Sequence, residues 1–525
     1  MMRQPAQGSG GNTARPKSIP APVGGWNTSD SIADMGVKDA VYLDNFFPRT
    51  SDVMLRKGFT EEAELAALKE IRTIMGYKAP NGTTKRFAAA QDGIYDITAG
   101  GVIGAAVTAA TNAAWEYTPV TTAGGSFLLM CNGVDLMKLY DGAAWTNLND
   151  VSVPAITGIT TSDVSNIAKF KTRVILCKKD TLSFYYLPNN AIAGAATEFP
   201  LGALFSKGGY LMATSTWTLD GGEGPDDYFV AITSEGEVAV YRGTDPSSAA
   251  TFALVGVYQL AKPMGKRCFV KLASDTAVIT QDAIYPLSKS LGMAKVDRRP
   301  AISNKIQRVY NEFAQAYSDL FGWSVTLFPE ASMLLVNVPI LNYPALGIIY
   351  SYQFVMNTMT GAWCRFTGMH AECFTAFDGQ LYYALHNKVY QAWDGLSDNG
   401  ANIIGRGKTA FNPLGTGGAK HITMLKPMIS AGAAIELQLG IDMDFEDTTL
   451  QSSSASYVQS LSLWDSAEWD SSKWNGNSLI ISKWRTAACK MGRVAATRLR
   501  CAAKDVSMTW IATDLLVDDS RGGLG

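Results

Sequence analysis

The chain has 525 residues, 18% of them charged, with 45 Lys and Arg against 47 Asp and Glu and a formal net charge of −2. At roughly 150 residues per domain, this length allows two to four domains and a core large enough to fold unaided. Proteins that grip nucleic acid usually have a basic excess or a basic run, because their affinity comes from neutralised phosphates. Neither is present, which argues against dedicated DNA binding.

The seven cysteines form no Cys-x-x-Cys pair, and most lie in apolar runs such as Leu129-Met130-Cys131. This pattern indicates small buried hydrophobes in a reducing compartment. The N-terminus shows no apolar signal region. Two charge-free stretches, residues 97–115 and 331–364, are too weakly apolar or too interrupted by Pro and Asn to span a membrane, and we expect buried strands there.

The first segment, residues 1–50, is predicted to be an extended N-terminal arm that leads into the first domain. Residues 1 to about 22 consist largely of Gly, Pro, Gln and Ser, with few apolar side chains. Such a segment cannot bury enough surface to order itself. We expect it, and residues 521–525, to order only against something outside its own domain.

Residues 51–404 show a loose recurrence of a turn followed by a short alternating aromatic strand. Asp-Gly and Asn-Gly pairs tolerate the positive φ angles of tight hairpins, so each marks a chain reversal. The instances begin at Asp92, Asn132, Asp180, Glu235, Gln281 and Asp378. Their spacing, roughly 40 to 55 residues with one double-length gap, is close to that of a four-stranded propeller blade. We therefore predict a mainly-β fold with a β-propeller, although two stacked sandwiches would also explain many short strands.

Helical periodicity is confined to two places within this segment. Residues 61–72 form the first. The second, residues 304–321, lies inside the double-length gap and is predicted to be a helical insertion in the propeller. Its apolar face would consist of Ile306, Val309, Tyr310, Phe313, Tyr317 and Leu320.

Residues 405–525 are predicted to form a separate β-rich platform domain. Residues 427–442 and 493–517 alternate as antiparallel strands do. Between them Trp464, Trp469 and Trp474 recur every five residues, each followed by Asp or Asn. Asp and Asn favour compact turns, and Trp dominates binding hot spots, so these three are the candidate protein-contact residues. A covered loop is the alternative.

Motifs for chemistry are incomplete throughout. Gly405-Arg406-Gly407-Lys408-Thr409 ends like a phosphate-binding loop, but Asn402 stands where the earlier Gly is needed. Asp442-x-Asp444-x-Glu446 begins like a calcium loop, but Asp447 replaces its Gly and Ser453 its last ligand. The acidic loop 220–227 is interpreted as a solvated turn. The three histidines are widely spaced and no Gly-x-Ser-x-Gly elbow is present. We therefore expect no enzyme, no cofactor, and no catalytic or metal site.

Three runs carry a resemblance to a known family. They are residues 24–35 (GGWNTSDSIADM) with 39–50 (DAVYLDNFFPRT) and 55–59 (LRKGF), residues 334–339 (LLVNVP) with 353–363 (QFVMNTMTGAW), and the Trp464–Trp474 turns. In order and spacing they resemble the tail hub or nozzle proteins of short-tailed bacteriophages, also described as tail tubular or DNA-stabilisation proteins.

The resemblance implies a β-propeller with an added β-rich platform, assembled as a hexameric ring below the portal and adaptor. Its location would be the virion tail, after synthesis in the host cytoplasm. Partners would be other copies of the chain, adaptor or portal-proximal proteins, and tail fibre or needle proteins. Viral DNA would pass through the channel without tight binding, and no membrane insertion is expected. The alternative is a β-propeller that binds or degrades glycans at the host cell surface, which a buried Asp/Glu pair at the propeller axis would favour.

The tryptophan turns give a first prediction. Replacing two of Trp464, Trp469 and Trp474 by Ala should weaken assembly by several kcal/mol, because indoles at the centre of an interface contribute much of its binding energy. Analytical ultracentrifugation and thermal melting of the monomer measure the two effects. A large loss of monomer stability with unchanged assembly would show that these residues are core instead.

Overall fold

The computed structural model describes residues 14–220, 225–272, 275–290, 300–341, 349–415, 418–433, 435–453, 479–487 and 491–518. The chain forms two compact units, each assembled from separate stretches of sequence. The propeller unit comprises Phe59–Met356 and Thr367–Asp394, and the sandwich unit comprises Met1–Gly58, Asn357–Phe366 and Gly395–Gly525. Candidate Trp464, Trp469 and Trp474 lie outside the described residues.

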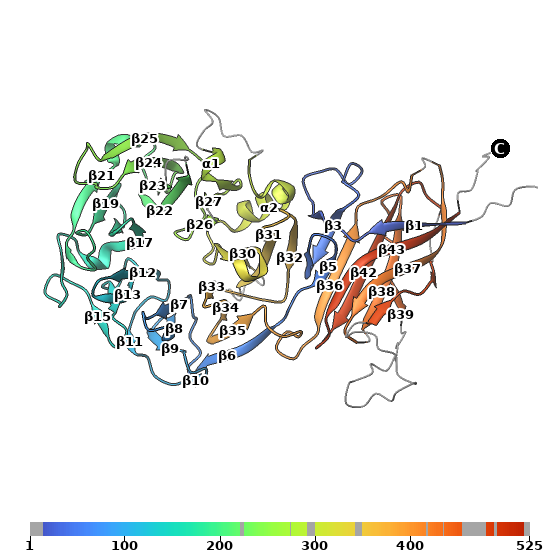
Figure 1. Cartoon of the computed structure of the whole chain (residues 1–525), viewed down its shortest axis with the longest axis horizontal. Helices are drawn as coiled ribbons and strands as arrows, with labels where there is room; N and C mark the ends of the chain where they lie inside the picture. Colours follow the sequence, from blue (N-terminus) through green and yellow to red (C-terminus); the bar gives the residue numbers. More distant parts are fainter. Residues whose placement is uncertain are drawn as a thin grey trace, which may run out of the picture. The chain divides into compact units, whose positions relative to one another are not determined.

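The described part of the propeller unit contains seven successive sheets arranged around a central axis (Figure 1). Strand β33 contacts β29 on one side and β7 on the other, which closes the ring. The predicted mainly-β propeller is therefore observed. The innermost strands of the seven blades, in chain order, are β7 (Thr73–Lys78), β12 (Glu116–Thr122), β17 (Val164–Phe170), β22 (Leu211–Asp220), β26 (Phe269–Leu272), β29 (Ser324–Phe328) and β33 (Cys373–Phe377).

Outer strands complete the first six blades by antiparallel pairing. They are β8 (Thr84–Ala90), β9 (Gly93–Asp96) and β11 (Thr108–Ala109); β13 (Gly125–Cys131), β14 (Lys138–Tyr140) and β15 (Trp145–Asn147); β18 (Arg173–Lys178), β19 (Ser183–Tyr186) and β21 (Thr197–Pro200); β23 (Pro225–Thr233), β24 (Glu237–Gly243) and β25 (Phe252–Gln259); β27 (Asp275–Ile279) and β28 (Ile284–Pro286); and β30 (Met333–Leu341) and β31 (Ile349–Asn357). Strand β10 (Gly101–Ile103) adds to the outer edge of the last blade by pairing parallel with β6 (Phe59–Leu65). The other short elements lie in the connections between strands, namely β16 (Ile156–Thr157), β20 (Gly194–Ala195), η1 (Thr161–Asp163), η2 (Gly202–Leu204) and η4 (Pro329–Ala331).

The last blade joins the two ends of the propeller sequence. Strands β33, β34 (Gln380–Leu385) and β35 (Lys388–Ala392) are completed by β6 (Phe59–Leu65), which pairs antiparallel with β35. The helix predicted over residues 61–72 is therefore wrong, because β6 occupies its first half. A β-bulge opposite Val389 and Tyr390 interrupts the alternation of β6, which is why no two-residue period marks this strand in the sequence.

The predicted turn recurrence corresponds to a fixed place in the blade. The first five instances lie between the second and third strands of five consecutive blades, and Asp378-Gly379 lies one hairpin earlier, between β33 and β34. Gly236 shows why this turn favours glycine. Its φ is +82°, and a Cβ there would lie 2.5 Å from the carbonyl oxygens of Leu260 and Ala261. The double-length gap contains the β29–β31 blade.

The predicted helical insertion is confirmed. It comprises η3 (Asn304–Ile306) and α2 (Gln307–Tyr317), which follow the short helix α1 (Leu287–Ser290). Ile306 and Tyr310 are buried, and the Tyr310 hydroxyl donates to the carbonyl of Thr280, so the helix packs onto the blade of β26–β28. No helix in the described residues has the length and apolarity needed to cross a bilayer.

The sandwich unit consists of two sheets packed face to face. Phe46 and Trp510 from one sheet have ring centroids 6.2 Å apart, and Gly407 lies so close that a Cβ would be 3.0 Å from the Trp510 ring. One sheet contains β1 (Arg15–Pro20), β4 (Phe46–Pro48), β5 (Val53–Leu55), β37 (His421–Ala431), β40 (Leu479–Ile481), β41 (Arg485–Thr486) and β43 (Met508–Asp518). The other contains β2 (Gly25–Trp26), β3 (Asp39–Asp44), β32 (Trp363–Phe366), β36 (Ile403–Thr409), β38 (Glu436–Met443), β39 (Gln451–Ser453) and β42 (Ala495–Ala503).

The structure divides the chain differently from the predicted segments 1–50, 51–404 and 405–525. The expected N-terminal arm is part of the sandwich: β1 pairs along its whole length with β43, and Ile19 is fully buried. The expectation that residues up to about 22 need an outside partner is therefore wrong for residues 15–20. Their largely polar side chains gave no sign of a strand, because its order comes from backbone hydrogen bonds to β43. Residues 1–13 and 519–525 lie outside the described residues.

A buried ion pair holds the sandwich unit where its stretches of sequence meet. The Arg56 side chain is 0% exposed and donates to both carboxylate oxygens of Asp398 at 2.7 Å. Its Nε donates to Asn45 Oδ1 at 2.9 Å. A guanidinium taken out of water needs this full set of acceptors.

Replacing Asp398 by Ala should lower the free energy of unfolding by about 3–5 kcal/mol, because it leaves a buried charge without its partner. Asp52→Ala is the control in the same unit, since Asp52 pairs with the half-exposed Arg49, and it should cost less than about 1 kcal/mol. Urea denaturation measures both. Equal losses in the two variants would contradict the assignment.

Candidate functional site: the mouth of the propeller channel

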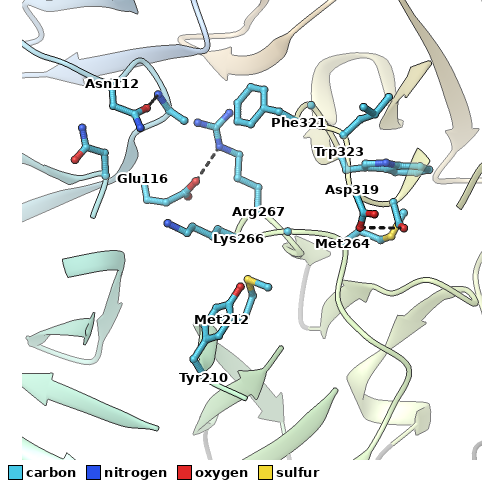
Figure 2. A pocket seen from close by; sticks show the side chains of 16 residues that line it. Asn112, Glu116, Tyr210, Met212, Met264, Lys266, Arg267, Asp319, Phe321 and Trp323 are labelled. Carbon is cyan, nitrogen blue, oxygen red and sulfur yellow. Dashed lines mark hydrogen bonds and ion pairs between the residues drawn. The ribbon is translucent and has the colours of Figure 1, made fainter. Parts of the chain in front are cut away.

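A cavity of about 370 Å³ lies at the end of the propeller where the chain enters the innermost strands. Its walls come from the segments that precede four of these strands, namely residues 112–116, 210–212, 264–267 and 318–323 (Figure 2). This cavity is called the mouth below. Because it is assembled from several blades, its geometry depends on closure of the ring.

Arg267 links three blades across the mouth. Its Nε donates to Glu116 Oε1 at 2.9 Å, and its Nη2 donates to Thr73 Oγ1 at 2.8 Å and to the Trp115 carbonyl at 2.9 Å. Its Nη1 reaches the Arg72 carbonyl at 3.2 Å. Burial opposes the charge of Arg267, but the Glu116 carboxylate, with smaller contributions from Cys373 and Tyr117, outweighs it, so the pKa of Arg267 is raised above its ordinary value. The arginine acts as a crosslink between β26, β7 and β12.

The ring of Phe321 packs against two guanidinium groups at the mouth. The guanidinium of Arg72 lies 5.1 Å and that of Arg267 5.7 Å from the centre of its ring, both within range of a cation–π interaction. Trp323, two residues on, donates its indole N–H to the Tyr317 carbonyl at 2.8 Å. The helical insertion therefore ends in a segment that is fixed over the mouth, as Figure 2 shows for Phe321 and Trp323.

Glu372, the residue before β33, is the most perturbed acid at this end of the propeller. Burial, and then repulsion from Glu70, raise the pKa of Glu372 to about 7. Its side chain is 16% exposed, its Oε1 lies 3.7 Å from His386 Nδ1, and its Oε2 has no hydrogen-bond partner among the described residues. A carboxyl group that holds its proton near neutral pH can act as a general acid or as a pH-dependent hydrogen-bond donor.

Glu116 and Glu372 are two acids next to the starts of innermost strands, where the axial carboxylate pair of a glycan-degrading propeller would be sought. They begin or precede innermost strands of blades that are separated by the β7 blade. Glu116 is engaged by Arg267, whereas Glu372 faces Glu70 and His386. Each carboxylate therefore has its own partners, and the arrangement fits a crosslinked scaffold at least as well as an acid–base pair.

The remaining motifs singled out in the sequence have structural roles where they are described. Residues 405–409 lie in β36, paired with β3 and β42, so they form no phosphate-binding loop. The Asp442 carboxylate is buried against Lys408 at 2.9 Å, and Asp444 accepts from the Arg493 amide at 2.7 Å. Within the described residues, no cluster of three or more His, Cys, Asp or Glu could hold a metal ion.

Sequence reasoning missed the residues of the mouth. Arg267 and Glu116 belong to no motif, and 151 positions separate them. The one available signal is positional: in a propeller the residues just before each innermost strand converge on the axis. Cys131, Cys177, Cys268, Cys364, Cys373 and Cys501 are buried and unbonded as predicted, and Cys489 lies outside the described residues.

No protein-family model and no curated protein matches this chain. Solved structures match it at low identity. The Cps50 (Swd1) β-propeller domain of Myceliophteria thermophila is 11% identical, covering 64% of this chain and 98% of that one, with a TM-score of 0.38. YCF48 from Cyanidioschyzon merolae is 10% identical, covering 63% and 98%, with a TM-score of 0.35. The extracellular domain of a hybrid two-component system from B. thetaiotaomicron is 10% identical with a TM-score of 0.40; the match covers 65% of this chain and only 41% of that chain.

Glu372 gives a prediction about pH. Because its pKa in the folded state is raised from 4.5 to about 7, the stability that goes with the protonated carboxyl is present below about pH 4.5 and lost as the pH rises through 7. Glu372→Gln should therefore stabilise the protein relative to wild type at pH 8, by up to about 3 kcal/mol, and have little effect at pH 4.5. Thermal melts across this range measure it. The exposed Glu330→Gln is the control, and a pH-independent difference for Glu372→Gln would contradict the assignment.

Proposed function

We propose that this chain is a structural subunit of a short bacteriophage tail, forming a ring-shaped hub or nozzle that retains packaged DNA and guides it during ejection. The observation that carries the proposal is the place of the resemblance in the fold. Residues 24–59 supply β2 to β5 of the sandwich and then enter β6, the strand that closes the propeller. Trp26, Phe46 and Trp363, from the quoted runs, are buried. The first two of the three runs that resemble the tail family therefore lie in strands of the two units.

The electrostatics of the chain support a conduit rather than a DNA clamp. Each phosphate contact must be broken as the genome slides, so a conduit is expected to leave few cations free for DNA. Many basic side chains here are paired within their own unit, as in Arg267–Glu116, Arg365–Asp44 and Lys426–Asp514. In the proposal, copies of the chain form a homohexamer in the virion tail, in contact with adaptor or portal-proximal proteins and with tail fibre or needle proteins.

A glycan-binding or glycan-degrading propeller remains the second candidate, and Glu372 is the observation that favours it. A protonated carboxyl at this end of the propeller could serve as the general acid of a glycosidase, with a second Asp or Glu of the chain as its partner. The two proposals separate on assembly and on turnover. A closed ring without polysaccharide hydrolysis supports the tail subunit, and hydrolysis that is lost in Glu372→Gln supports the enzyme.

Negative-stain imaging of the purified full-length chain, alone and mixed with its phage adaptor, should show closed rings whose channel admits duplex DNA, roughly 20 Å across. DNA binding by the assembled ring should be no tighter than weakly micromolar. Its salt dependence should correspond to about two or fewer phosphate contacts per subunit, because the basic side chains are balanced by acids and form no run in the sequence. A steep salt slope would contradict the conduit, and particles that never close would contradict the tail assignment.

A further inference from the structure

The turn between β34 and β35, formed by His386 and Asn387, ties the closing strand to the last blade. The amide of Leu65, at the end of β6, donates to the Asn387 carbonyl at 2.8 Å, and Asn387 Nδ2 donates to the Leu65 carbonyl at 2.9 Å. The amide of Ile71, on the segment that leads from β6 to β7, donates to the His386 carbonyl at 2.8 Å. This turn, called the clasp turn below, therefore holds both the end of β6 and the entry into the first blade.

The clasp turn has an unfavourable backbone conformation. His386 has a φ of +53°, in the left-handed region that side chains rarely adopt. A residue stays in such a conformation only where the surrounding contacts hold it. The His386 side chain is 61% exposed, so it adds little packing. The turn therefore depends on its hydrogen bonds, and a change of charge beside them can release it.

The side chain of Glu372 lies beside the clasp turn. Its Oε1 accepts from the His386 amide at 3.4 Å, and its own amide donates to the Ala384 carbonyl of β34 at 2.9 Å. Its Oε2 is closed off from water and has no hydrogen-bond partner among the described residues. A negative charge on this carboxyl is therefore poorly compensated, and it is avoided either by protonation or by exposing the side chain to water.

Two charged neighbours of Glu372 lie on the segment before β7. Glu70 repels a charge on Glu372, and Arg72 attracts it less strongly. Arg72 is already paired with Glu70 at 2.8 Å. In the clasp turn, His386 Nδ1 lies 3.7 Å from Glu372 Oε1, and it offers a positive charge only when the imidazole is protonated. The closed arrangement therefore favours the uncharged carboxyl.

The other elements near Glu372 supply no free positive charge. A Cβ at Gly322, on the segment before β29, would lie 3.7 Å from the Glu372 carbonyl oxygen, and Asp319 of that segment lines the mouth, which Glu372 does not. Burial lowers the pKa of His370, two residues before Glu372, so this imidazole is uncharged at neutral pH. The remaining cations are paired with acids: Lys388 with Glu61 and Glu64 beside the clasp turn, and Arg267 with Glu116 next to Cys373.

We propose that the clasp turn is a pH-dependent closure of the propeller, which holds β6 while the Glu372 carboxyl is protonated and opens locally once that proton is lost to solvent. Burial, and then repulsion from Glu70, raise the pKa of Glu372 from 4.5 to about 7 in the closed turn. An open turn exposes the carboxyl to water, where its proton leaves at lower pH. Closure is therefore complete below about pH 4.5 and weakens as the pH rises through 7. This inference does not depend on the proposed tail function.

Hydrogen exchange of the full-length chain, resolved to single amides and corrected for the intrinsic pH dependence of exchange, tests the proposal. Protection of the Leu65 and Ile71 amides, whose acceptors lie in the clasp turn, should fall at least tenfold between pH 5 and pH 8, because raising the pH favours the open turn. Leu211 is the matched control. Its amide donates to the Thr181 carbonyl at 2.8 Å in a connection between two other blades, and its protection should change less than twofold.

Three variants show which carboxyl is responsible. In Glu372→Gln, protection of Leu65 and Ile71 should stay within twofold from pH 5 to pH 8, because the amide side chain does not titrate. Glu70→Gln should reduce the fall seen in wild type, because it removes the repelling carboxylate. Glu330→Gln, at an exposed position, should leave the fall as it is in wild type.

Three results would overturn the proposal. Protection of Leu65 and Ile71 that does not depend on pH in wild type would show that the turn stays closed. An equal fall at Leu211 would show that the charge acts on the whole fold and not on the clasp turn. A fall that persists in Glu372→Gln would assign the titration to another group, such as His386.

Discussion

The pairing of β6 with β35 is the constraint on which the propeller depends. Residues 59–65 meet residues 388–392 across more than three hundred positions of chain, and this contact converts a row of blades into a closed ring. Closing so long a loop costs conformational entropy that is recovered only when the innermost strands pack around the axis. The mouth exists only in the closed ring, since Glu116, Arg267 and Phe321 come from different blades and have no local contacts in sequence that would hold them together.

Arg267 shows how the closed ring is then stiffened. A guanidinium at the axis is unfavourable unless its donors are satisfied, and here four of its hydrogen bonds reach side chains and carbonyls of β7, β12 and the residues before them. The same bonds occupy Glu116, which would otherwise be an unshielded carboxylate in the channel. The Arg267–Glu116 pair that crosslinks the blades thus also makes Glu116 unavailable as a catalytic acid, whereas Glu372 keeps a raised pKa.

Local patterns in the sequence predicted what is locally determined. The recurrent turns mark the same hairpin in five blades, and in three of them a turn residue, Gly133, Asp180 or Gly236, has a positive φ. The face of Ile306 and Tyr310 predicted α2 because it must be buried. Pairing between distant strands has no such local signal. The composition of β1 suggests disorder, yet the strand is ordered because its backbone pairs with β43. The bulge in β6 breaks the two-residue alternation, so the sequence of this strand suggests a helix. The interleaving of the two units and the convergence of Glu116 on Arg267 have no sequence signal shorter than the whole fold.

Net charge and local charge answer different questions in this protein. A value of −2 for the whole chain describes how the surface meets a polyanion at a distance, and it agrees with the proposed conduit, which would not bind DNA tightly. It says nothing about Lys266 and Lys271, whose field is concentrated inside a narrow channel lined by hydroxyls and apolar side chains. Arg267 crosses that channel, and the cavity that the two lysines line holds about 310 Å³, so duplex DNA has no access to these lysines. These lysines therefore add nothing to the affinity of the chain for duplex DNA, which depends on the outer surface, where water and salt screen the charges.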